Sequence, residues 1–145
     1  MYLNAITAVK SGNLTAAQSN VLNGDNKLIA RTGNWINYSP VIGAFNNDEQ
    51  ISQWAGDTAT VYGQRATHFE IRGVKGPNRG KMEVFVDGTS KGVVDLYSVD
   101  WQLNQTLYSQ PTSGAGLHQL KVVNVSTDAA VSQVGIDSIV ITEQP

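Results

Sequence analysis

The sequence predicts an all-β protein, an antiparallel β-sandwich of about eight strands arranged as a jelly roll. Segments rich in β-branched and aromatic residues alternate apolar and polar side chains with a period of two, the pattern of strands with one buried face. Short clusters of Gly, Asn, Asp and Pro separate these segments at the intervals typical of a sandwich. No segment carries the apolar periodicity of a long helix.

The N-terminal part of the chain has the weakest pattern. Residues 1–23 contain a few spaced apolar residues and an Ala-rich stretch too short to form a stable helix alone. We therefore predict an arm or linker over 1–23 and the sandwich module over 24–145. The first predicted strand is 27–37, and a long polar connection, 39–49, follows it.

The middle of the chain, residues 56–98, has the clearest strand pattern. It predicts four consecutive strands, at 58–62, 67–72, 81–86 and 92–97. Asp87 and Gly88 favour the left-handed backbone of a tight hairpin turn between the last two of these strands.

Three further strands complete the predicted sandwich. They lie around 105–108 and over 117–125 and 134–142, with a turn cluster at 111–116 between the first two. The alternation along all the strands predicts a shared apolar core. Its members are Trp35, Phe69, Ile71, Val84, Val86, Leu120, Val122, Ile136 and Ile139.

Composition narrows the class of partner. The 145 residues are enough for one domain with a sizeable core. Lysine and arginine number 10 and aspartate and glutamate 12, a balance that argues against nucleic acid or an anionic membrane as the partner. The polar but weakly charged surface suits neutral ligands such as sugars. The absence of cysteine favours a bacterial or viral origin, and the first residues lack the pattern of a signal peptide.

An ordered set of motifs runs through residues 24–142. The motifs are LIARTGNW (28–35), GDTATV (56–61), IRGVKGPNRG (71–80), VFVDG (84–88), VDLYS (94–98), GLHQLKV (116–122) and IDSI (136–139). In this order they resemble galactose-binding-domain-like carbohydrate-binding modules. The resemblance implies a non-catalytic β-sandwich of the kind appended to glycoside hydrolases and found in bacteriophage tail adhesion proteins.

The resemblance also implies a role. The expected function is to attach a larger assembly, a phage tail or a glycoside hydrolase, to bacterial cell-surface polysaccharide, outside the cell or on a virion. An alternative is a structural module that docks a partner protein in a virion or a multidomain enzyme. A small glycosidase is disfavoured because turns and exposed strand faces account for Asp57, Glu83 and Asp95. We therefore predict that the chain is not an enzyme.

A saccharide site needs an aromatic face and hydrogen-bonding groups in a concave setting. Trp101 lies in a polar loop and is the predicted platform, with a hydrophobic plug beneath the loop as the alternative. Lys75, Asn78 and Arg79 lie in the Gly- and Pro-rich segment 73–80. They are the predicted polar contacts, unless this segment is simply a solvated hairpin loop.

Three more residues are candidates for saccharide contact. Arg72 and Tyr97 are predicted to line an open sheet face, and Trp54 lies where a loop meets a strand. Asp137 is predicted to point inward, and similar modules often hold a structural calcium there or nearby. The sequence shows no partner ligands for a metal, so we assign neither a metal site nor a cofactor.

Overall fold

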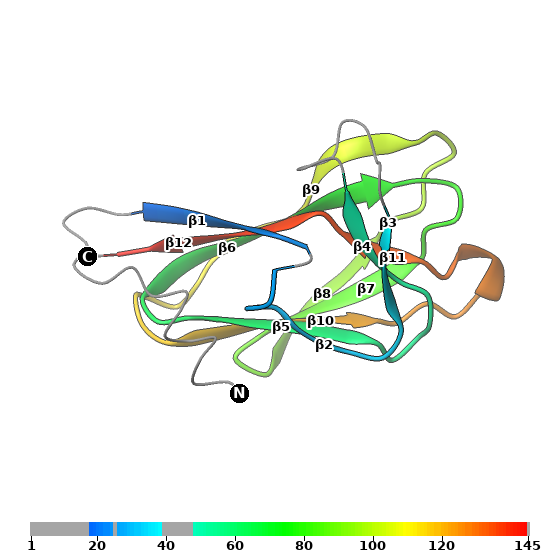
Figure 1. Cartoon of the computed structure of the whole chain (residues 1–145). Coiled ribbons are helices and arrows are strands. Elements are labelled where there is room, and N and C mark those ends of the chain that lie inside the picture. Colours follow the sequence, from blue (N-terminus) through cyan, green and yellow to red (C-terminus); the bar gives the residue numbers. More distant parts are fainter. Residues whose placement is uncertain (1–17, 25, 39–47, 145) are drawn as a thin grey trace.

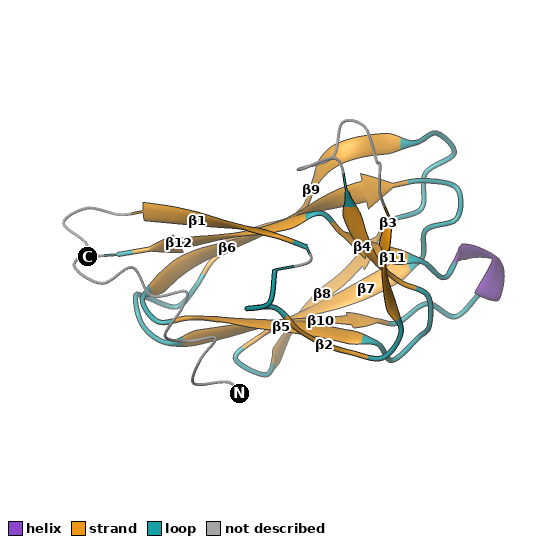
Figure 2. Cartoon of the chain, in the orientation of Figure 1, coloured by secondary structure: helices purple, strands orange, loops and turns teal. Residues whose placement is uncertain are grey.

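The computed structural model describes residues 18–24, 26–38 and 48–144, and strands are the main secondary structure of these ranges (Figure 1). Within these ranges, twelve strands form three antiparallel sheets of four, five and three strands. Figure 2 shows one short 3-10 helix among them, η2 (Ala129–Val131). The predicted all-β antiparallel sandwich is confirmed. No helix in the described ranges has the length and apolar character needed to cross a bilayer.

Two large sheets face each other across the core. The four-stranded sheet has the order β1 (Gln18–Asn23), β12 (Ser138–Glu143), β6 (Ala66–Lys75) and β9 (Gln102–Pro111). The five-stranded sheet has the order β2 (Ala30–Thr32), β5 (Thr58–Gly63), β10 (His118–Asn124), β7 (Lys81–Val86) and β8 (Thr89–Asp95). The small sheet has the order β11 (Val134–Ile136), β4 (Glu49–Ser52) and β3 (Trp35–Tyr38).

The structure has more strands than the predicted eight because two predicted strands are each divided and because β1 and β4 lie in segments for which no strand was predicted. Gly33 interrupts the predicted strand 27–37 with a positive φ of 93°, so that β2 and β3 enter different sheets. A break at Asp137 likewise separates β11 from β12 within the predicted strand 134–142.

The N-terminal prediction meets the structure only at its end. Of the predicted arm or linker 1–23, residues 1–17 lie outside the described residues, whereas 18–23 form β1. This strand pairs with β12 along its whole length and buries Leu22 in the core. The sandwich therefore begins before residue 24. One buried leucine leaves no clear alternation in the sequence, and main-chain pairing to a distant strand defines β1 instead.

The core lies between the two large sheets. Of the predicted core residues, all except Trp35 are buried. Trp35 is half-buried and packs at the edge of the core, with its indole N–H donating to the carbonyl oxygen of Thr32 at 2.9 Å. An indole N–H needs such a partner, which keeps this ring at the margin.

The hairpin between β7 and β8 is also confirmed. Asp87 and Gly88 adopt positive φ values of 53° and 79°. The Asp87 carboxylate accepts the main-chain N–H of Gln119 at 2.8 Å and contacts Nδ1 of His118 at 2.5 Å. Nε2 of His118 in turn contacts the carbonyl oxygen of Gly114. Two acceptors on one ring favour the protonated imidazole.

These contacts shift two pKa values in opposite directions. Burial lowers the pKa of His118, but the hydrogen bonds to Asp87 and Gly114 outweigh it, so the pKa lies above its ordinary value. Burial raises the pKa of Asp87, but the bonds from Gln119 and His118 outweigh it, so that pKa lies below its ordinary value.

Replacing His118 by Gln tests this pair. Because the His118 pKa is higher in the folded protein than its ordinary value of 6.5, the protonated ring stabilises the fold fully below pH 6.5. This stabilisation is lost as pH rises through the folded-state pKa. Because the Asp87 pKa is lower in the folded protein than its ordinary value of 3.8, the ionised carboxylate stabilises the fold above pH 3.8. This stabilisation is lost as pH falls through the folded-state pKa. Chemical denaturation from pH 3 to 9 should therefore show the largest difference between wild type and variant between these limits. A difference independent of pH would contradict this assignment.

Candidate functional site

Four connections meet at one end of the sandwich, which we call the loop end (Figure 2). They are residues 53–57, 76–80, 96–101 and 125–133. Main-chain hydrogen bonds join them or anchor them to β10. Gly76 N–H donates to Leu96 at 3.0 Å, and Gly80 N–H donates to Gln133 at 2.8 Å. Gly56 N–H donates to Asn124 at 2.7 Å.

Three exposed aromatic side chains mark the loop end. Trp54 is 61% exposed, Tyr97 48% and Trp101 54%. Exposed aromatic side chains at one end of a fold are candidates for contact with a ligand or partner. The Trp101 ring is too exposed to be a plug buried beneath its loop, and its role as a platform stays a prediction.

Trp101 lies against the loop that follows β6. Its ring covers Gly76, since a Cβ atom built on Gly76 would lie 2.3 Å from Cε3 of Trp101. The guanidinium carbon of Arg79 lies 5.4 Å from the centroid of the same ring, within cation–π range. The loops predicted to supply the platform and the polar groups therefore meet.

Arg79 occupies a different position from the one predicted. The sequence placed it among exposed donors, whereas its side chain is 4% exposed and pairs with the buried Glu49, Nη2 to Oε1 at 2.8 Å. Burial raises the pKa of Glu49 to about 7, although Arg79 lowers it, and the nearby Asp137 raises it further. Arg79 thus supports the Trp101 ring from within the protein.

Lys75 and Asn78 lie on either side of Gly76 and Pro77. Lys75 is the last residue of β6 and is half-exposed. Asn78 is tied to Gln133, because its Nδ2 donates to Oε1 of Gln133 at 3.2 Å and its carbonyl accepts the Gln133 N–H at 3.3 Å. In this arrangement Asn78 holds two loops together, and Lys75 keeps the freer side chain.

Two hollows flank the segment 126–128 at the loop end. The first, of about 460 Å³, is bordered by Trp54 and η2. The second, of about 280 Å³, is bordered by Tyr97, Lys81 and Asp95. The first is within the size range of small-ligand sites. Sequence reasoning missed this segment because Asp128, Ala129 and Ala130 lie between two predicted strands and are typical of a turn.

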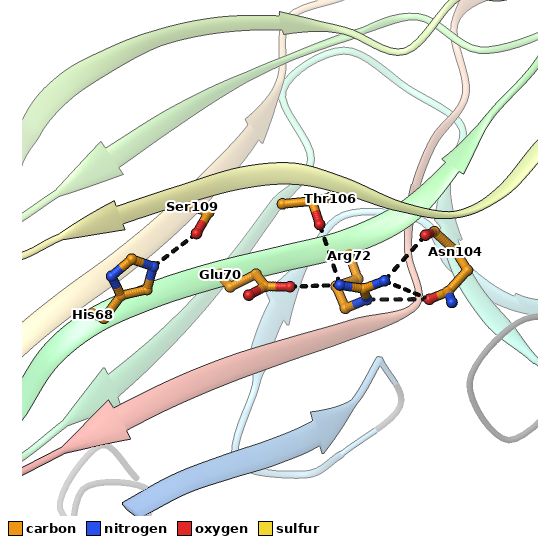
Figure 3. Close-up of polar contacts among 6 residues, drawn as sticks. All are labelled: His68, Glu70, Arg72, Asn104, Thr106 and Ser109. Atoms are coloured by element: carbon orange, nitrogen blue, oxygen red, sulfur yellow. Dashed lines mark hydrogen bonds and ion pairs between the residues drawn. The ribbon is translucent and has the colours of Figure 1, made fainter. Parts of the chain in front are cut away.

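Arg72 lies elsewhere, on the outer face of the four-stranded sheet (Figure 3). Its Nη1 donates to Glu70 at 2.7 Å and to Thr106 at 3.2 Å. Its Nε and Nη2 donate to the side-chain oxygen of Asn104, and Nη2 also reaches the Asn104 main-chain oxygen at 3.1 Å. These contacts occupy the donors of the guanidinium group.

The role of Arg72 here is to join β6 to β9. The pairing of these strands shifts register after Ile71, and Asn104 has a positive φ of 55° that is uncommon outside glycine. His68 makes a second link on the same face, to Ser109 at 2.7 Å. Tyr97 was predicted to share a sheet face with Arg72. This prediction is wrong, because Tyr97 follows β8 and borders the second hollow at the loop end.

The resemblance implies a structural calcium at or near Asp137. No three His, Cys, Asp or Glu side chains gather as a metal site within the part of the chain that the structure describes. Asp137 is fully buried, as predicted, and the neighbouring Glu49 carboxylate is paired with a guanidinium group. These residues do not fit a calcium ligand set of the usual composition.

Structural comparison confirms the fold. The chain is similar to a family two carbohydrate esterase from Cellvibrio japonicus, with a TM-score of 0.65 and 12% identity over 88% of the chain, and it spans 34% of that protein. It is also similar to the CBM36-1 domain of a xylanase from the hindgut metagenome of Trinervitermes trinervoides, with a TM-score of 0.52 and 16% identity over 86% of the chain and 96% of the domain.

A third similar structure is the carbohydrate-binding module CBM36 in complex with calcium and xylotriose. The TM-score is 0.56 and the identity 14%, over 86% of this chain and 99% of the module. No family model matches the chain, and no curated protein sequence matches it. At these identities the similarity shows a common fold, which carbohydrate-binding modules share with domains of larger enzymes.

Proposed function

We propose that this chain is a non-catalytic saccharide-binding module whose ligand lies across the loop end. The observation that carries the proposal is the exposure of Trp54, Tyr97 and Trp101 at the loop end, where Trp54 borders the first hollow and Tyr97 the second. The face of a pyranose ring is weakly apolar and its rim carries hydroxyl groups. Exposed aromatic rings, together with hydroxyl and main-chain groups in and near the hollows, offer complementary surfaces to both.

The charges at the loop end favour a neutral saccharide. Lys81 faces Asp95 across the β7–β8 pair, and Arg79 is already paired with Glu49. Charges balanced in this way leave little excess positive potential for the carboxylates of an acidic sugar. Thr127 borders both hollows and is exposed, so its hydroxyl can hydrogen-bond sugar hydroxyls.

The wider role is part of the same proposal. The module would attach a larger assembly, a phage tail or a glycoside hydrolase, to polysaccharide of a bacterial surface, outside the cell or on a virion. Full-length similarity to two CBM36 modules supports a binding rather than a catalytic domain. We expect the chain to release no reducing sugar from polysaccharides. One weak site per module would make multivalent display important for retention.

Trp101→Ala and Trp54→Ala test the site. Xylotriose is the first probe, since the similar CBM36 module is known in complex with it, followed by a glycan array and calorimetry with any positive glycan. Measurements are made with calcium chloride present and again after chelation. Each variant should weaken binding by about tenfold or more, or about 1.4 kcal/mol, by loss of stacking. Both rings are exposed, so the melting temperature should change by only about 3 °C or less.

Leu117→Ala is the matched control, because it removes an apolar side chain that is 58% exposed, borders neither hollow and lies outside the four connections of the loop end. Unchanged binding in both tryptophan variants would place the ligand elsewhere, and the outer sheet face around Arg72 would be examined next. If no saccharide on the array binds the wild type, the module docks a partner protein instead.

A further inference from the structure

We infer that Gly76 and the buried Glu49–Arg79 pair are positioning residues that fix the orientation of the Trp101 ring for ligand stacking. The inference rests on the proposed function, in which this ring contacts the saccharide. It assigns a binding role to two residues, Gly76 and Glu49, that lie outside the ligand surface.

Gly76 provides the surface on which the indole rests. A Cβ atom at this position would lie 2.3 Å from Cε3 and 2.4 Å from Cζ3 of Trp101, far inside normal contact distance. The three nearest atoms to such a Cβ all belong to the Trp101 ring. The backbone of Gly76 does not require glycine, because its φ is not in the left-handed region. Glycine is therefore needed at this position because a side chain would overlap the Trp101 ring.

Main-chain hydrogen bonds fix Gly76 relative to the loop that carries Trp101. Its N–H donates to the Leu96 carbonyl at 3.0 Å, and its carbonyl accepts the Ser98 N–H at 3.1 Å. Residues 76 and 97 consequently form a short parallel bridge. The support and the ring thus lie in two connections that main-chain hydrogen bonds join, although Gly76 and Trp101 are 25 residues apart in the chain.

The ion pair approaches the same ring from the interior. The Arg79 guanidinium lies 5.4 Å from the ring centroid, and Glu49 holds it through one hydrogen bond of 2.8 Å. The Glu49 carboxylate reaches this place because Gly135 has no side chain, since a Cβ there would lie within 1.8 Å of Glu49 Oε2. A buried pair joined by a single bond depends strongly on the charge of the carboxylate.

This dependence makes the ring sensitive to pH near neutrality. Burial raises the pKa of Glu49 to about 7, and the charged groups that act on it are Arg79 and Asp137. Below this pH Glu49 takes up a proton and loses its attraction for Arg79. The guanidinium is then held less firmly beside Trp101, and the indole is expected to change its environment.

Fluorine NMR of protein labelled with 5-fluorotryptophan tests the inference without a ligand. The chain has three tryptophans, and Trp101→Phe identifies the Trp101 signal. Gly76→Ala and Glu49→Gln should each shift this signal. Gly116→Ala should leave it in place, because the nearest atom to a Cβ at Gly116 is 3.9 Å away and its φ is also ordinary. In the wild type the signal should titrate with a midpoint near pH 7, and Glu49→Gln should abolish that titration.

Xylotriose binding to the same full-length variants supplies the second measurement. Gly76→Ala should raise the Kd by about tenfold, as expected when an aromatic contact is lost, and Gly116→Ala should leave it unchanged. Should Glu49→Gln fail to fold, Gly76→Ala and the wild-type titration still decide the matter. A Trp101 signal that is unchanged by Gly76→Ala and constant between pH 6 and 8 would overturn the inference.

The two measurements separate this inference from the proposed function. Suppose that Gly76→Ala or Glu49→Gln moves the Trp101 signal, but the variant binds xylotriose or another array-positive glycan as tightly as the wild type does. The role of these residues in positioning the ring then stands. The ligand role of Trp101, and with it the role of Gly76 and Glu49 in binding, is then overturned.

Discussion

Replacing Phe69 by Ala is expected to lower the free energy of unfolding by about 3–5 kcal/mol. Phe69 is 1% exposed and belongs to β6, where it lies beside Ile141 of β12 and faces the other large sheet. Its removal leaves a cavity between two sheets that main-chain ladders hold apart, so the core cannot collapse to fill it. Urea denaturation monitored by circular dichroism measures the loss.

Phe85 offers the matched control. It lies on β7 with the alternate orientation, outside the core, and is only half-buried. Phe85→Ala should cost clearly less than Phe69→Ala, since part of its ring already contacts water. A loss below about 1 kcal/mol for Phe69→Ala would place that side chain at the surface and contradict the register of β6.

Arg79→Met should also cost about 3–5 kcal/mol, because it leaves the Glu49 carboxylate buried without its cation. The side chains of the pair are 4% and 1% exposed, so water cannot replace the missing partner. The variant should be more stable at acid than at alkaline pH. A Glu49 pKa raised above its unfolded value of 4.5 contributes stability that is lost as pH rises through the folded-state pKa.

The double variant Glu49→Leu with Arg79→Met separates charge from packing. Removing both charges should recover most of the loss, because an apolar pair of similar volume carries no desolvation cost. Denaturation at pH 6, 7 and 8 of the two single variants and the double variant gives the coupling between the residues. A double variant less stable than Arg79→Met alone would show that hydrogen-bond geometry, and not charge, holds this part of the loop end.

The stability of the Glu49–Arg79 pair is relevant to function because this pair lies beneath the proposed saccharide site at the loop end. The saccharide site proposed there uses exposed rings, which contribute little to stability and can be replaced singly. The ion pair beneath one ring contributes both to stability and to the position of that ring. Measuring binding and stability in the same variants therefore separates residues that contact ligand from residues that hold the site together.

Local pattern was sufficient to predict most strands of the two large sheets. Period-two alternation in β6, β7 and β10 identified the buried faces, and Phe69, Val84 and Leu120 lie where the alternation placed them. Asp87 and Gly88 identified the hairpin, because its left-handed turn depends on those two residues alone. Predictions of this kind succeed because adjacent residues on a strand point to opposite faces whatever the rest of the chain does.

The candidate site could be predicted only in part. The sequence named Trp54, Tyr97 and Trp101 as candidate saccharide contacts, and all three side chains are exposed. Their roles in binding stay predictions. Arg72 and Arg79 were named for their chemistry, but one joins two strands on the outer face and the other is buried. Residue type indicates what a side chain can do, and burial decides what it can reach.

The sequence by itself determined the β-sandwich class, the faces of the long strands and the aromatic residues available for a ligand. Only the tertiary structure decided that Gly76 lies beneath Trp101 and that Glu49 pairs with Arg79. Glu49 and Arg79 are 30 residues apart, and each has an ordinary local sequence. The physical reason is that strand alternation is a property of neighbouring residues, whereas ring support and ion pairing arise where separate loops are brought together by the packing of the sheets.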